Sequence, residues 1–98
     1  MASFNISIEL RSEIDAKGNY RRLRDRMNEN GFKHSVGDKS GIHYRLPRDE
    51  FTFVGYYSRH EILDKVCEIV SEFIPEPGVM VTESAGRVWR GLKEIDLS

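Results

Sequence analysis

The sequence predicts an α+β protein with the ferredoxin-like split βαβ order, β-α-β-β-α-β, followed by an extra C-terminal strand. This order is predicted because two segments with helical periodicity are separated by segments in which apolar and polar residues alternate. Each predicted helix has one apolar stripe, so both helices are expected on one face of an antiparallel sheet. The 98 residues are expected to form a single ferredoxin-like domain, because a second core could not be buried with so little chain.

The first strand is expected in SFNISIEL, residues 3–10, because apolar side chains occupy every second position. After a charged linker, Asn19 is the expected N-cap of the first helix, since its side chain can accept a hydrogen bond from a helix N–H group. Gly31 is expected to end this helix in the left-handed conformation. The apolar stripe of the helix consists of Tyr20, Leu23 and Met27.

Short strands are then expected in FKHSV (32–36), IHYRL (42–46) and FTFVGYY (51–57). The stretch GDKSG predicts a turn between the first two, and Pro47 ends the second. The segment FTFVGYY has the strongest strand pattern in the chain, with Phe51 and Phe53 on one face.

The second helix is expected to begin at Ser58, because SRHE is a capping box in which Ser58 and Glu61 satisfy each other's backbone N–H groups. Its inward stripe consists of Ile62, Val66, Ile69, Val70 and Phe73. Beyond it, a strand is expected at 79–83, a tight turn at SAG and the extra strand in RVWRGL, residues 87–92. Residues 93–98 are expected to form a loose tail.

The charge of the chain restricts its binding partners. Fifteen Lys and Arg residues against sixteen Asp and Glu give a net charge of -1, which excludes a strongly basic protein that coats nucleic acid. Any site for a polyanion must therefore be local. No apolar stretch approaches the roughly 20 residues of a membrane span, and the alternating N-terminus does not predict a secretory signal. We therefore expect a cytoplasmic protein without membrane contact.

The sequence contains no motif for a metal or a small-molecule cofactor, and we expect neither. Cys67 is the single cysteine, which excludes a multi-cysteine metal site. His34, His43 and His60 are scattered along the chain. We interpret each histidine as an ordinary, partly exposed polar residue rather than as a metal ligand or a general base. Trp89 is interpreted as a packing residue of a terminal hairpin, with RNA stacking as the alternative.

Four arginines lie within six positions of the first predicted helix. On a helical wheel centred on the apolar stripe, Arg21 and Arg22 point to solvent, and Arg24 and Arg26 fall on opposite borders of the stripe. Asp25 is expected to pair with Arg21 or Arg22. A solvated helix face explains Arg21 and Arg22, whereas a border guanidinium is pre-organised for phosphate by the packing of its stem. The pattern therefore allows either a solvated face or a nucleic-acid contact.

The stretches RLRDRM, NENGF and GFKHSVGDKSGIHYRLPRDEFTF resemble the GhoS-type antitoxins of type V toxin–antitoxin systems. The resemblance covers roughly residues 4–73, as single matches at constant spacing. It implies a small ferredoxin-like protein, similar to a nuclease-like subunit of the CRISPR adaptation machinery. The implied activity is sequence-selective endoribonuclease cleavage of the messenger RNA of a cognate membrane toxin.

The functional arginine of that family falls on Arg24. The resemblance therefore implies that Arg24 is the catalytic residue, which stabilises charge on the phosphoryl group, with Arg21, Arg22 and Arg26 contacting RNA. Two departures indicate a divergent member. The acidic residue that ends the family's first strand has no clear equivalent here, and VTESAGRVWRGLKEIDLS does not resemble the family's C-terminus.

The alternative function is a non-catalytic binding module of the same fold, acting through another protein or through self-association. Thr52, Val54 and Tyr56 would form part of a half-apolar open sheet face. The extra strand at 87–92 could fold back on its own sheet or pair with a second copy. We expect a homodimer, in which two copies join their first-helix arginines into one basic surface. The residues alone leave open whether the chain is an enzyme.

Overall fold

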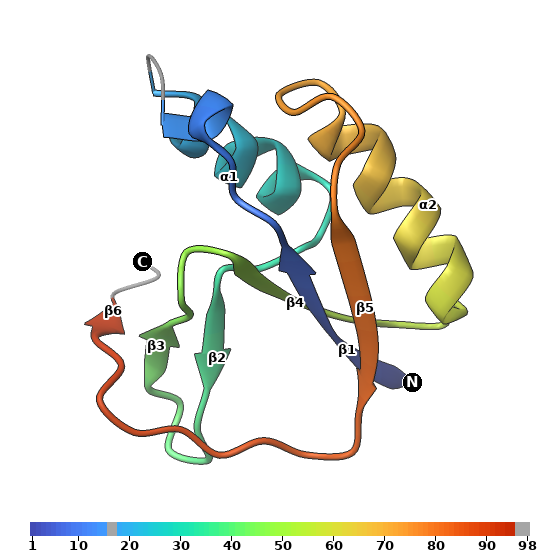
Figure 1. The fold of residues 1–98 in the computed structure, drawn as a ribbon. Coiled ribbons are helices and arrows are strands. Elements are labelled where there is room, and N and C mark those ends of the chain that lie inside the picture. Colours follow the sequence, from blue (N-terminus) through green and yellow to red (C-terminus); the bar gives the residue numbers. More distant parts are fainter. Residues whose placement is uncertain (16–17, 96–98) are drawn as a thin grey trace.

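A computed structural model of the chain describes residues 1–15 and 18–95, which form the predicted α+β fold (Figure 1). Three strands lie between the two α-helices, as the three predicted segments at 32–36, 42–46 and 51–57 indicate, although the order β-α-β-β-α-β names only two. The elements are β1 (Ala2–Ile8), a short 3-10 helix η1 (Ser12–Asp15), α1 (Asn19–Glu29), β2 (Ser35–Gly37), β3 (His43–Arg45), β4 (Glu50–Gly55), α2 (Arg59–Val70), β5 (Val79–Ser84) and β6 (Glu94–Ile95).

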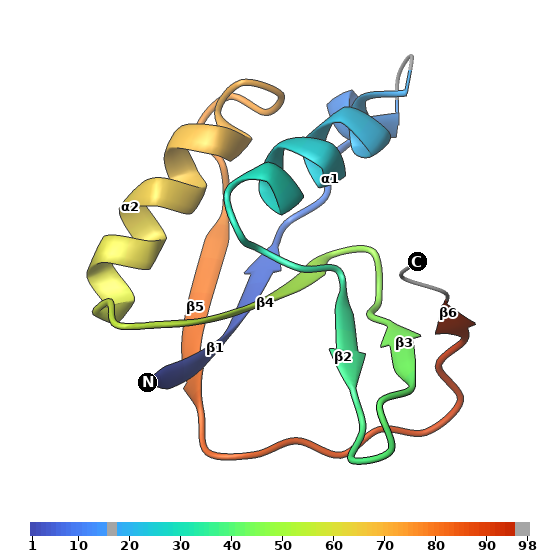
Figure 2. The same ribbon diagram turned by 180° about the vertical axis from the view of Figure 1, so that it is seen from behind.

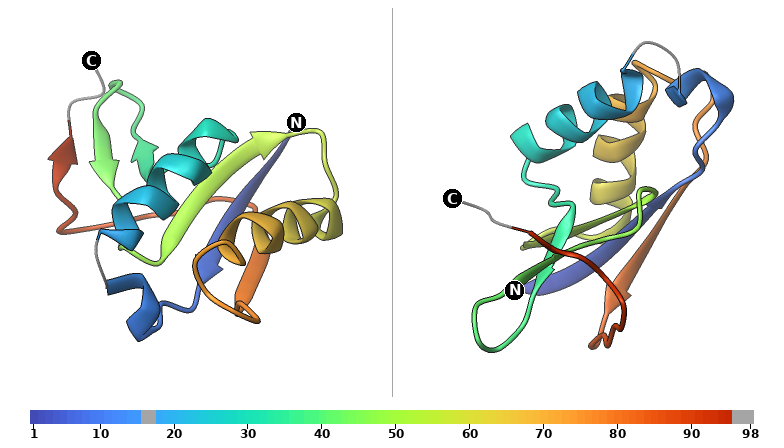
Figure 3. Two further views of the ribbon diagram at one scale, coloured as in Figure 1. Left: turned by 90° about the horizontal axis from the view of Figure 1, so that it is seen from above. Right: turned by 90° about the vertical axis from the view of Figure 1, so that its left-hand side faces the viewer.

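The first sheet has the antiparallel order β4-β1-β5. Alternation along β1 directs Phe4, Ile6 and Ile8 to one face, where all three are buried, as the period of SFNISIEL predicts. Both α-helices cover this same face, as expected (Figure 3). The helices complete the core with Leu23, Met27, Ile62, Val66, Ile69 and Val70.

A second sheet, in the order β2-β3-β6, lies beside the first (Figure 2). The single sheet expected from the sequence is therefore divided in two. Lys33 and Thr52 connect the two sheets, since the backbone N–H of each donates to the carbonyl of the other at 2.8 Å. The Thr52 hydroxyl, buried at this junction, donates to the carbonyl of Ser35 at 3.1 Å. Because the segment before β2 thus lies next to β4, the arrangement is compatible with a ferredoxin-like order.

The strand predicted at residues 87–92 is wrong. This segment crosses from β5 to the second sheet without strand pairing, and the strand forms later, where β6 pairs with β3. Gly91 has a φ of 79°, which interrupts an extended backbone. The expected loose tail therefore contains a strand at Glu94–Ile95, and residues 96–98 lie outside the described part of the chain.

Side chains also anchor the crossing segment to the rest of the molecule. Arg87 donates to Oδ1 of Asn5 at 2.6 Å, and the Trp89 ring lies 5.8 Å from the Tyr44 ring. Since β6 and Trp89 both find partners within the chain, an unpartnered C-terminal strand no longer supports the expected homodimer. Self-association itself stays a prediction.

The two α-helices begin differently. Helix α2 has the predicted capping box: the Ser58 hydroxyl accepts from the Glu61 N–H at 3.1 Å, and the Glu61 carboxylate accepts from the Ser58 N–H at 2.9 Å. For α1 the predicted cap is wrong, because Gly18, with a φ of 73°, is the N-cap and no side chain caps the helix. Asn19 instead donates its amide to the carbonyl of Glu13 at 2.8 Å, which connects α1 to η1.

Candidate functional site

The positive charges of three arginines from separate parts of the chain act on Tyr20, in the first turn of α1. Arg24 lies one turn further along the helix, Arg45 ends β3, and Arg48 lies in the loop before β4. Burial raises the pKa of Tyr20, and the positive charges of Arg24, Arg48 and Arg45 oppose this effect. All three guanidinium groups are therefore electrostatic neighbours of one phenol. We call Arg24, Arg45 and Arg48 the arginine cluster.

Tyr20 holds the loop that carries Arg48. The Tyr20 hydroxyl donates to the carbonyl of Arg48 at 2.9 Å, and the Arg48 guanidinium carbon lies 4.4 Å from the centre of the Tyr20 ring. Arg48 also forms an ion pair with Asp15 at 3.3 Å. These contacts fix the loop against the start of α1 and so bring positive charge next to Arg24.

Arg24 occupies the helix border that the helical wheel predicts, and its side chain is half-buried. Within residues 1–15 and 18–95, no carboxylate lies within ion-pair distance of its guanidinium group. A guanidinium with a packed stem and no anionic partner in this part of the chain is suited to bind a phosphate.

Arg26 lies on the opposite border of α1, as predicted, but faces α2. Its guanidinium forms ion pairs with Glu72, in the turn that follows α2, at 2.9 Å and with Glu29 at 3.2 Å. The hydrogen bonds that Arg26 donates to Glu72 and Glu29 raise the pKa of Arg26 further above its usual range. The structure therefore separates Arg26 from the arginine cluster and gives it an anionic environment.

The remaining two arginines of α1 are exposed, as the helical wheel predicts. Arg22 donates to the side-chain oxygen of Asn19, and this contact uses part of its hydrogen-bonding capacity. The expected ion pair of Asp25 with Arg21 or Arg22 does not form among the described residues. Neither arginine is brought next to Tyr20 in the way that Arg45 and Arg48 are.

The sequence predicts no function for His34, yet the fold brings it within the influence of the charges of Arg24 and Arg45. His34 lies between α1 and β2, and its carbonyl accepts a hydrogen bond from the Leu46 N–H at 2.9 Å. Nδ1 of its half-buried ring lies 3.3 Å from Oδ1 and 3.2 Å from Nδ2 of the Asn28 amide. A hydrogen bond to Asn28 therefore holds the ring from the last turns of α1.

The surroundings of His34 favour its neutral form. Burial lowers the pKa of His34, and the positive charges of Arg24 and Arg45 lower it further, while Asp25 has the opposite, smaller effect. An imidazole with a pKa below its usual value of about 6.5 is mostly neutral at pH 7. The residues next to His34 in the sequence do not reveal this lowered pKa, because Arg45 comes near the ring only when β2 and β3 pair as a hairpin.

This arrangement combines two chemical capacities. Guanidinium groups bind phosphate oxygens and stabilise negative charge that develops on them. A neutral imidazole can accept a proton from a substrate hydroxyl. Among the described residues, no group of three or more His, Cys, Asp and Glu side chains is placed to hold a metal ion.

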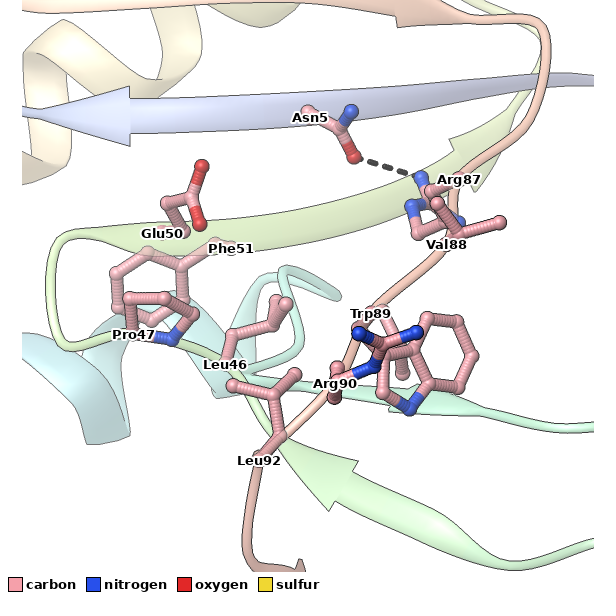
Figure 4. Close-up of a pocket in the computed structure, with 11 residues that line it drawn as sticks. Asn5, Leu46, Pro47, Glu50, Phe51, Arg87, Val88, Trp89, Arg90 and Leu92 are labelled. Atoms are coloured by element: carbon pink, nitrogen blue, oxygen red, sulfur yellow. Dashed lines mark hydrogen bonds between the residues drawn. The ribbon is translucent and has the colours of Figure 1, made fainter.

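A separate cavity of about 300 Å³ lies between the helix-free face of the first sheet and the crossing segment (Figure 4). Asn5 and Arg87 face each other across it, and Trp89 packs on Tyr44 at its rim, as the packing interpretation of Trp89 predicts. The cavity includes no residue of the arginine cluster and no histidine. We therefore place the candidate site at α1 and not here.

Comparison with known proteins identifies the family of the chain. Residues 1–83 match the protein family described as endoribonuclease GhoS, and this range includes the arginine cluster and His34. No individual curated protein matches the chain significantly. No described helix has the length and apolar character needed to cross a membrane. Because the family match spans most of the sequence, the chain belongs to the GhoS family of endoribonuclease antitoxins.

Proposed function

We propose that this chain silences a cognate membrane toxin by cleaving its messenger RNA in the cytoplasm, and that the arginine cluster is the cleavage site. The observation that carries the proposal is the gathering of Arg24, Arg45 and Arg48 around Tyr20, within the part of the chain that matches the endoribonuclease family. A near-neutral protein thereby gains one locally basic surface, as binding to RNA requires.

In the proposed reaction, the nucleophile is the 2′-hydroxyl of the RNA, which attacks the adjacent phosphorus. No covalent enzyme intermediate is needed. Arg24 stabilises the negative charge that develops on the non-bridging phosphoryl oxygens, and it can do so in a bidentate way. The products are a 2′,3′-cyclic phosphate and a 5′-hydroxyl end.

Substrate binding is assigned to the neighbouring charges. Arg45 would hold an adjacent phosphate, and Arg48 would hold another in exchange for its single ion pair with Asp15. The exposed Arg21 and Arg22 would steer the RNA towards the site. Arg26 was expected to contact RNA as well, but Glu72 and Glu29 compete with phosphate for its guanidinium. We therefore expect Arg26 to contribute least to RNA affinity.

The test compares cleavage of AU-rich and structured RNAs by the wild-type chain, Arg24→Ala and Arg59→Ala. Arg59 is an exposed arginine at the start of α2 and serves as the matched control. We expect Arg24→Ala to lower the single-turnover rate by about 100-fold or more, by analogy with the loss of one oxyanion-stabilising donor. Arg59→Ala should behave as wild type. Unchanged cleavage by Arg24→Ala would remove this residue from the mechanism.

The identity of the RNA target can be tested with the reading frame that lies next to this gene on the chromosome. A short, hydrophobic reading frame next to the gene would be the expected toxin, and its messenger should be cleaved faster than an unrelated RNA of equal length. A wild-type chain that binds a protein or itself but cleaves no RNA would support the non-catalytic binding module instead.

Self-association stays a prediction under this proposal. Two copies would place two arginine clusters in one assembly and strengthen RNA binding. Light scattering at micromolar concentration should then give twice the 11.4 kDa mass of the chain. A mass that stays at the monomer value at high concentration excludes the dimer.

A further inference from the structure

His34 is a histidine that the family resemblance left without a role, and it lies at the edge of the arginine cluster. It follows α1 directly, where the chain turns towards β2, and the carbonyl of His34 is paired with the Leu46 N–H of the segment after β3. The backbone of His34 is thereby fixed between the two elements that supply Arg24 and Arg45.

The orientation of the imidazole ring leaves one nitrogen available. In the tautomer protonated at Nδ1, the ring donates to Oδ1 of Asn28, at 3.3 Å. The Nε2 lone pair is then free to accept a proton, and no described residue makes a hydrogen bond to Nε2. Asn28 therefore acts as a positioning residue that holds the ring in either tautomer: its Oδ1 accepts from a protonated Nδ1, and its Nδ2 lies 3.2 Å from Nδ1 to donate in the other form. The tautomer with the proton on Nδ1 is the one that a base requires.

The charged groups around the ring also suit a base. Arg24 of α1 and Arg45 of β3 disfavour the imidazolium, and Asp25 of α1 is the acidic group that acts against them. Any RNA phosphate held by Arg24 would lie next to this neutral ring. The nucleophilic 2′-hydroxyl adjoins the scissile phosphate, so a base here would be close to the proton that must be removed.

We propose that His34 is the general base of the cleavage reaction, an inference that rests on the function proposed above. Nε2 of His34 takes the proton of the 2′-hydroxyl as the bond between O2′ and phosphorus forms. The bond between phosphorus and O5′ breaks, and O5′ takes a proton from solvent water. The imidazolium then returns its proton to solvent, so no oxidant, reductant or further reactant is needed.

The experiment measures the pH dependence of single-turnover cleavage at subsaturating RNA, together with RNA affinity, for four chains. These are wild type, His34→Ala, His34→Gln and the control His60→Ala, whose exposed histidine lies in the first turn of α2. For wild type and His60→Ala, the rate should rise with pH and level off above an inflection below about 6.5. Both His34 variants should lose this inflection and about 100-fold or more in rate at pH 7, with RNA affinity changed less than threefold.

A second measurement keeps a structural defect apart from a chemical one. Thermal melts must show that the His34 variants are folded, and an NMR titration of the free protein gives the pKa of His34 directly. The kinetic inflection should coincide with this titrated value. A different value, or a His34→Ala chain with the wild-type rate and pH profile, overturns the assignment of the base.

The outcomes also separate this inference from the proposed function. One outcome is that wild type and His34→Ala both cleave RNA whereas Arg24→Ala does not. The proposed function then stands and the inference about His34 fails. A wild-type chain that cleaves no RNA overturns both.

Discussion

Helices α1 and α2 pack on the same face of the first sheet, but they are built differently. Helix α2 buries Ile62, Val66, Ile69 and Val70 and starts with a capping box. Helix α1 buries only Leu23 and Met27, lacks a side-chain cap and carries the half-buried Arg24. Helix α2 therefore belongs to the scaffold and α1 presents the site, and both helices depend on packing against the sheet for stability.

The largest effect is expected from Leu23→Ala, which removes one of the two buried side chains of α1. It should lower the free energy of unfolding by about 3 kcal/mol and also slow cleavage, because the docking of α1 positions Arg24. Val66→Ala in α2 should cost about 2 kcal/mol and leave the activity of the folded fraction unchanged. Urea melts and cleavage rates measure both. Equal losses of activity in the two variants would contradict the division of roles.

A smaller effect is expected at the start of α2. Ser58→Ala removes the hydroxyl that accepts the Glu61 N–H and should lower the free energy of unfolding by about 1 kcal/mol. Hydrogen exchange should show faster opening of the first turn of α2, while the rest of the helix stays protected. If Ser58→Ala destabilised more than Val66→Ala, the inward stripe of α2 would be assigned wrongly.

The same cap predicts a pH dependence. Hydrogen bonds from the Ser58 backbone and side chain lower the pKa of Glu61. The folded carboxylate therefore contributes stability that is present above its ordinary pKa of about 4.3 and is lost as the pH falls through the lower folded value. Wild type should be more stable than Glu61→Gln at pH 7, and the difference should vanish in acid. A difference that grew on acidification would contradict this sign.

The smallest effect on stability is expected from Arg26→Gln, which removes the ion pair between α1 and Glu72 in the turn after α2. The side chains of Arg26 and Glu72 are 40% and 43% exposed, so water and salt screen their attraction. The thermal midpoint should change little and the change should shrink further in high salt. Cleavage by Arg26→Gln should fall far less than cleavage by Arg24→Ala. These two variants compare the two borders of the apolar stripe of α1 directly. Equal losses of cleavage would mean that Arg26 also serves the site.

Much of the local structure follows from short sequence patterns. The capping box at Ser58, the positive φ of Gly31 at 89° and the burial pattern of β1 all agree with the prediction. So do the border positions of Arg24 and Arg26 on α1. These features depend on side chains within about one helical turn or on strict alternation, so they can be predicted from the sequence without the tertiary contacts.

The sequence by itself thus determined the fold class, both helices with their inward faces, and Arg24 as the arginine held at a border. Only the tertiary structure decided the division into two sheets, the position of β6 and the neighbours of Arg24. Arg45 and His34 meet Arg24 because the Lys33–Thr52 bridge and the β2–β3 hairpin return the chain towards α1. No local pattern encodes that approach, since it results from pairing between segments far apart in the chain, where packing and burial outweigh intrinsic preference.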